Sequence, residues 1–142
     1  MNVNTHIEYK KIALTELVFE LNKKFKLPAK GISVDIDLSV KTEIKKSKTL
    51  VCSLTAELFK NAKKDNSAPF YLRATIEGHF ESDERTALKD FAAVNAPAHL
   101  LPFMRELIAN TTMRASVPPL FIPPLNIKSI VEHSEKKKKG AK

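Results

Sequence analysis

The chain alternates apolar and polar residues through four stretches, which is the spacing of β-strands that bury one face. These stretches are residues 14–21, 32–41, 50–58 and 70–80. The connections at residues 45–49 and 61–69 are rich in lysine, and they are long enough for hairpin turns but too short for crossover helices. The pattern therefore predicts a four-stranded antiparallel sheet with the order of a meander.

After the fourth stretch, the apolar spacing changes to that of amphipathic helices. Ser82 or Asp83 can cap a short helix, and Pro97 then interrupts or restarts the path. A longer helix is predicted over residues 98–114, with Pro102 near its first turn, where a missing N–H costs least. Strands followed by helices predict an α+β domain with the helices packed on one face of the sheet. The longer helix is apolar around much of its circumference, which is typical of an oligomer interface.

Residues 117–127 read Val-Pro-Pro-Leu-Phe-Ile-Pro-Pro-Leu-Asn-Ile, which is strongly apolar yet compatible with neither a regular helix nor a central strand. The four prolines lack the N–H that a hydrogen-bonded ladder needs. An extended segment of this kind either covers a core or forms one wall of a hydrophobic groove. Because it is stiff, it loses little entropy when another chain docks on it.

Length and charge limit the number of domains in the chain and the classes of partner that it can bind. Its 142 residues suffice for one domain with a single core, which we expect over residues 1–131, followed by a basic, disordered tail at residues 132–142. The formal net charge of +8 is compatible with attraction to nucleic acid. A nucleic-acid-binding module therefore stays open as an alternative, although two Tyr and no Trp offer no stacking platform for bases.

Neither a membrane span nor a catalytic centre is predicted. No apolar run approaches the ~20 residues that a span needs, and residues 1–11 lack the apolar core of a signal peptide, so we expect a cytoplasmic protein. Cys52 lies on the apolar side of its strand and is expected to be a buried thiol. The histidines and glycines form no zinc-ligand spacing or phosphate-binding loop, and Asp35 and Asp37 share a sheet face where solvated carboxylates are ordinary. The sequence thus predicts no enzyme, no metal site and no cofactor.

From Pro97 to Ile127 the chain resembles the carboxy-terminal half of the SecB family of protein-export chaperones. The matching positions are Pro97, Leu100, Pro102, Phe103, Arg105, Glu106, Ile108, Arg114, Pro118, Leu120, Pro124 and Asn126. The strand region is similar in order and length. The resemblance implies a cytoplasmic holdase that binds unfolded polypeptides without ATP. It also implies a homotetramer built from two dimers, with helices sandwiched between two sheets.

In that family, client segments occupy long grooves between the sheet edge and the proline-rich crossover loop. Carried over by position, the resemblance implies that three sets of apolar residues line the groove. They are Val34, Ile36, Leu38 and Val40, then Phe70, Leu72, Ala74 and Ile76, and finally Leu120, Phe121 and Ile122. Each of them can equally be an ordinary core residue, and we favour Phe121 and Ile122 for binding.

Family members that deliver clients to the translocase motor SecA dock the motor's zinc-binding tail on an acidic patch of the sheet. Glu16 and Glu20 occupy two of those acidic positions, whereas Arg73 stands where another carboxylate is expected. The tail of this chain is also basic rather than acidic, and both differences reverse the electrostatics of motor docking. Some relatives instead protect the antitoxin of a toxin–antitoxin pair, which is the alternative role for this chain. A structural oligomer without a client is a further alternative.

Overall fold

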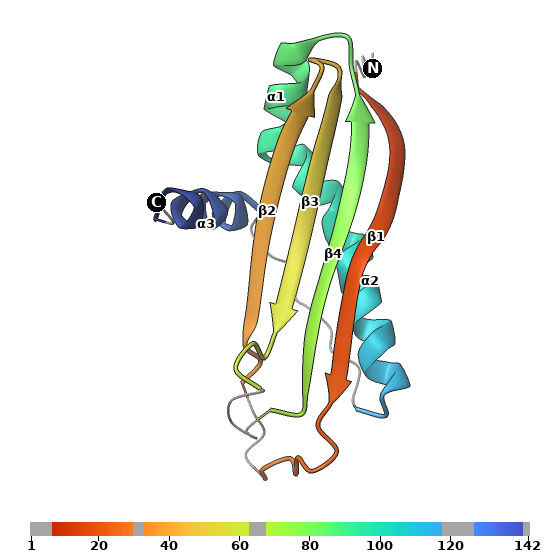
Figure 1. The fold of residues 1–142 in the computed structure, drawn as a ribbon, viewed down its shortest axis with the longest axis vertical. Helices are drawn as coiled ribbons and strands as arrows, with labels where there is room; N and C mark the ends of the chain where they lie inside the picture. Colours follow the sequence, from red (N-terminus) through yellow and green to blue (C-terminus); the bar gives the residue numbers. More distant parts are fainter. Residues whose placement is uncertain (1–6, 30–32, 63–67, 118–126, 141–142) are drawn as a thin grey trace.

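A computed structural model describes residues 7–29, 33–62, 68–117 and 127–140. Its elements are β1 (Glu8–Leu21), β2 (Ile36–Lys45), β3 (Thr49–Leu58), β4 (Phe70–Glu81), α1 (Arg85–Ala93), α2 (Asn95–Arg114) and α3 (Ile127–Gly140). The four strands form one antiparallel sheet, α1 and α2 lie across one of its faces, and α3 stands beside β2 (Figure 1). The predicted α+β class, with helices on one face of the sheet, is confirmed.

The strand order is β1-β4-β3-β2, which differs from the predicted meander at one strand. Strands β2, β3 and β4 follow one another as predicted, but β1 pairs with β4 instead of β2. Residues 22–35 join the ends of these two outer strands, and the resulting order is that of a Greek key. Asn22 anchors the start of this connection, since its backbone N–H donates to the Pro69 carbonyl at 2.9 Å. Alternation along a strand predicts its faces but not its neighbours.

The core lies between the two central strands and α2. The inward-facing side chains of β3 have no exposed surface, and those of β4 are at most 4% exposed. From β3 they are Leu50, Cys52, Leu54, Ala56 and Leu58, and from β4 they are Phe70, Leu72, Ala74, Ile76 and Phe80. Each fully buried leucine stabilises the fold by roughly 1.5–3 kcal/mol relative to an exposed one. Burial also raises the pKa of the Cys52 thiol to about 12, in keeping with the predicted buried thiol.

Helix α2 begins three residues earlier than predicted, which changes the position of both prolines. Pro97 lies in the first turn, where its missing N–H is one that no helix satisfies internally. Pro102 falls in the second turn instead of the first, so the helix loses one internal hydrogen bond there. Ser82 does not cap α1 directly, since its Oγ accepts the Glu84 backbone N–H at 3.1 Å and the helix begins at Arg85.

Helix α3 runs through most of residues 132–142, the segment that the sequence predicts to be a disordered tail. The first half of the helix packs on β2, with Ile127 and Ile130 partly buried against the core. The Val40 backbone N–H donates to Ser134 Oγ at 2.8 Å, which ties the helix to the strand. The packing of this apolar first half, which the lysine-rich sequence obscured, accounts for the difference.

Candidate functional site: a cleft beside the edge strand β2

Strand β2 lies at one edge of the sheet and, within the described ranges, pairs with β3 alone, on its inner side. The Val40 N–H points to the outer side, where it meets Ser134 of α3. Because backbone groups alternate sides along a strand, the N–H groups of Thr42 and Ile44 also point outward. Among the described residues, Ser134 is the hydrogen-bond partner on this outer side. The second half of β2 therefore presents backbone donors and acceptors to a potential additional strand.

A cleft of about 460 Å³ runs beside this edge, between β2, α1 and α3. Its lining residues are Val40, Lys41, Thr42, Glu43, Ile44, Arg85, Lys89, Ala92, Ala93, Val131 and Ser134. The volume is in the usual range for ligand clefts, and the lining combines aliphatic surface with charged groups at the rim. An extended polypeptide can therefore pair its main chain with β2 and place alternate side chains against Ile44 and Ala92.

The predicted groove residues of β2 have three different environments. Leu38 is 8% exposed and belongs to the core, while Ile36 and Val40 are half-buried and pack at the margin of the core. Val34 precedes the strand and is 42% exposed. Of these four, Val40 alone lines the cleft.

The predicted groove residues of β4 are buried in the core of the chain itself. Phe70, Leu72, Ala74 and Ile76 are at most 4% exposed, so a polypeptide would reach them only if the helices moved away from the sheet. Their contact with clients stays a prediction, and these side chains have almost no accessible surface with which to make it. Leu120, Phe121 and Ile122 lie outside the described residues, and their binding role also stays a prediction.

Sequence reasoning missed the residues that form the far wall of the cleft. Arg85, Lys89 and Ala92 come from α1, and Val131 comes from α3. The spacing of Arg85, Lys89 and Ala92 along α1 identifies them as one side of that helix. Their position beside β2 depends on how the helix packs, which the sequence pattern does not specify.

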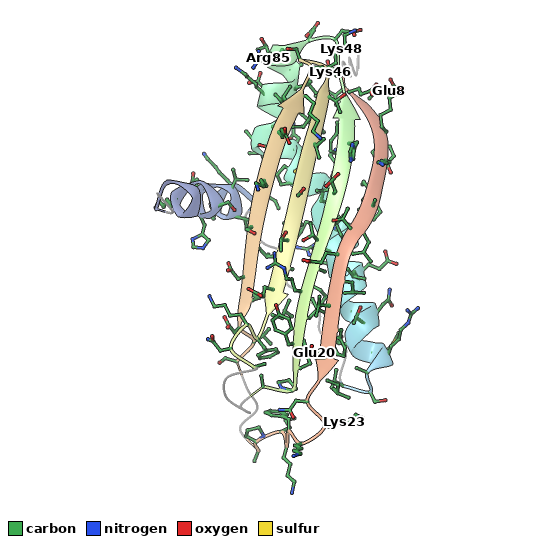
Figure 2. All side chains as sticks on the ribbon, viewed as in Figure 1. Glu8, Glu20, Lys23, Lys46, Lys48 and Arg85 are labelled. Carbon is green, nitrogen blue, oxygen red and sulfur yellow. The ribbon has the colours of Figure 1, made fainter. Side chains whose placement is uncertain are left out.

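The outer face of the sheet carries a network of paired charges around Arg73. Arg73 Nε donates to Glu16 Oε1 at 2.7 Å, and Arg73 Nη1 lies 3.8 Å from Glu57 Oε2. The Tyr71 hydroxyl donates to Glu57 Oε2 at 2.6 Å, and this hydrogen bond raises the pKa of Tyr71 to about 12. Glu20 lies opposite Tyr71 near the end of β1 (Figure 2). One of the two predicted motor-docking carboxylates, Glu16, is thus neutralised by Arg73.

The helix layer leaves several large apolar side chains uncovered. Phe103 and Met113 of α2 are 46% and 55% exposed, and Val94 between α1 and α2 is 40% exposed. Strand β1 adds Tyr9, Leu14, Leu17 and Leu21, which are also exposed.

Within the described ranges, no set of His, Cys, Asp or Glu side chains is arranged to hold a metal ion. No helix in the described part is both long and apolar enough to cross a membrane.

The fold and the site together define an α+β protein with an open sheet whose edge strand β2 lies beside a partly apolar cleft. The family model for SecB, described as preprotein translocase subunit SecB, matches residues 2–138. The chain belongs to the SecB family, which confirms the resemblance in its sequence and supports a chaperone role.

Two relatives illustrate the range of similarity. An uncharacterized protein of Methanocaldococcus jannaschii, MJ0357, is 28% identical over 141 residues, which cover 93% of this chain and 86% of that protein. The solved structure of the SecB-like chaperone Rv1957 of Mycobacterium tuberculosis, in complex with a ChAD peptide from the HigA1 antitoxin, matches with a TM-score of 0.67. That match covers 84% of this chain and 90% of the other at 19% identity, and it shows that the fold is shared.

Proposed function

We propose that this protein is an ATP-independent holdase that binds non-native polypeptides in the cytoplasm and prevents their aggregation. The observation that carries the proposal is the outer side of β2, where backbone groups of Thr42 and Ile44 lie along the cleft. Family membership supports the same class of function. No cofactor is needed, because binding and release of an extended chain change no covalent bond.

The composition of the cleft suits a binder of many sequences. Main-chain hydrogen bonds to β2 are available to almost every polypeptide, since every residue except proline carries both a donor and an acceptor. The aliphatic lining from Val40, Ile44 and Val131 adds burial worth about 25 cal/mol per Å² without demanding a particular side chain. This combination gives moderate affinity for extended apolar segments and low sequence specificity.

Replacing Thr42 with proline tests the role of the β2 edge. The Thr42 N–H points away from β3, so the sheet does not need it, and proline is tolerated at outward positions of edge strands. The substitution removes one donor and places a ring where a client strand would pair. We expect peptide affinity to fall about tenfold or more, together with the ability to suppress light scattering by a slowly refolding protein.

The matched control is Thr42→Ala, which removes the same side chain but keeps the backbone N–H. It should bind peptide as the unmodified protein does. Thermal unfolding of both variants checks that the sheet is intact. Full holdase activity of a folded Thr42→Pro variant would show that clients do not pair with this edge.

A narrower version of the proposal is that the protein holds a dedicated antitoxin. Two observations favour it: the SecB-like chaperone with the shared fold was solved with an antitoxin peptide, and Arg73 neutralises Glu16 at a predicted motor-docking position. The gene neighbourhood is the first test, because a dedicated chaperone is expected beside a toxin–antitoxin pair. Measurable binding of purified SecA, with no such pair nearby, would favour general export instead.

We also propose that the exposed apolar surface of α2 is covered by other copies of the chain in a homotetramer. Phe103→Asp would place a charge in that contact, and we expect it to shift the tetramer to dimers or monomers. Light scattering coupled to size-exclusion chromatography gives the mass directly. Asn61→Asp introduces the same charge at an exposed turn and should leave the mass unchanged. A tetramer that persists with Phe103→Asp would place the interface elsewhere.

A further inference from the structure

The cleft beside β2 has an uneven distribution of charge. Among the described residues that line it, three are basic, namely Lys41 of β2 and Arg85 and Lys89 of α1, and one is acidic, Glu43. Arg85 and Lys89 are one helical turn apart, and both are exposed. Within the described part of the chain, none of these three cations has a carboxylate within 4 Å. The cleft therefore has a net positive charge and basic groups available to a ligand.

The hairpin between β2 and β3 extends this positive region at the same end of the molecule. The connection is the tight turn of residues 46–48, in which Lys46 and Ser47 have φ angles of 52° and 57° and the Lys48 N–H donates to the Lys45 carbonyl. The Ser82 N–H donates to the Lys48 carbonyl at 3.0 Å and so ties the hairpin to the segment leading into α1. Figure 2 shows Lys46, Lys48 and Arg85 grouped at this end.

We infer that the cleft selects extended polypeptide segments that carry Asp or Glu residues next to their apolar stretch, placed against Arg85 and Lys89. The inference rests on the proposed holdase function and names the class of client that the same site prefers. Carboxylates match the fork of the Arg85 guanidinium, and the concentration of positive charge steers acidic segments toward the cleft. A segment flanked by lysine would instead meet like charges.

The lining favours a polypeptide over a nucleic acid as the acidic ligand. Ile44, Ala92 and Val131 supply aliphatic surface at the cleft, which alternate side chains of an extended peptide can cover. None of the described residues that line the cleft is aromatic, so these residues offer bases no stacking surface. The backbone edge of β2 also pairs with another peptide backbone but offers no matching pattern to a sugar–phosphate chain.

The test uses three synthetic peptides with one shared apolar stretch, flanked on one side by Glu, Lys or Ser residues, with affinity measured by fluorescence anisotropy. Because exposed ion pairs are individually weak, we expect the Glu peptide to bind about five- to tenfold more tightly than the Lys peptide at low salt. The preference should shrink as salt is added. In the Arg85→Glu/Lys89→Glu variant, the preference for the Glu peptide over the Lys peptide should reverse. The variant should keep α1 folded, because acidic side chains are favourable at the start of a helix.

The control variant Lys24→Glu/Lys60→Glu makes the same change in net charge at exposed positions that do not line the cleft, and it should keep the preference. Loss of the preference in this control would assign it to overall charge and overturn the inference. Equal binding of all three peptides, with aggregation still suppressed, would overturn the inference and leave the holdase function intact. Failure of every peptide to bind, with no suppression of aggregation, would overturn both. An oligonucleotide that displaces the Glu peptide at lower concentration than unlabelled peptide would overturn the inference as well.

Discussion

Replacing Leu100 with alanine is expected to lower the free energy of unfolding by about 2–5 kcal/mol. The side chain has no exposed surface and packs from α2 onto β4 beside Gly78, where the helix and the sheet approach closely. Truncation removes its buried methyl groups and leaves a cavity that the rigid sheet cannot fill. Urea unfolding followed by circular dichroism, at one fixed protein concentration, measures the loss.

Leu107→Ala provides the matched control, because Leu107 lies on the same helix and is only partly buried. Its cost should be clearly smaller, since less apolar surface is removed from the core. An equal loss in the free energy of unfolding for the two variants would mean that the contact of Leu100 with β4 contributes no more to stability than the partly buried Leu107 does.

Replacing Gly78 with alanine is expected to destabilise the protein by about 1–3 kcal/mol, although alanine normally restricts the unfolded chain and favours folding. A Cβ atom at this position would lie 2.8 Å from Leu100 Cδ2 and 3.0 Å from Phe80 Cε2, both closer than van der Waals contact. Leu100 and Phe80 are almost fully buried, so neither can move without disturbing its neighbours. Thermal unfolding of the variant at fixed concentration measures the effect.

The double variant Gly78→Ala/Leu100→Ala separates steric conflict from other causes. Once Leu100 is shortened, the added methyl group should cost much less and should partly fill the cavity, so the two effects should not add. Strict additivity would show that the glycine is needed for a reason other than the approach of Leu100. Cys52→Ala, at a buried position that faces Gly78 across the β3–β4 pair, tests whether any change nearby produces the same coupling.

The strands could be predicted because burial on one face imposes a period of two on the sequence. The predicted bounds of strand β3 are almost correct, since every second residue from Leu50 to Leu58 faces the core, with the polar residues Ser53, Thr55 and Glu57 between the later ones. Strand β2 was placed too early because its second half, from Lys41 to Lys45, is mostly polar. That half is held by pairing with β3, and its outward backbone is what makes the candidate site.

The cleft itself could not be predicted from the sequence. It forms where α1 and α3 meet β2, and the positions of both helices depend on packing between segments far apart in the chain. The family resemblance pointed to β4 residues such as Leu72, which the structure places in the core. It also pointed to β2, where Val40 borders the cleft, and a role of Val40 in binding clients stays a prediction. The ion pair of Glu16 with Arg73 could not be predicted either, because it depends on β1 lying beside β4.

The pairing of β1 with β4 delays folding of the first strand while the chain is synthesised on the ribosome. Thr15 Oγ1 donates to the Thr75 carbonyl across 60 residues, whereas β2 and β3 are joined by the short turn of residues 46–48. During synthesis, β1 emerges first yet must wait for β4, and closing so long a loop is entropically slow. Until then, the apolar side of β1 has nothing to cover it. A nascent copy of this protein therefore exposes apolar surface and is prone to aggregation, which is the state in which we propose that the folded protein binds other polypeptides.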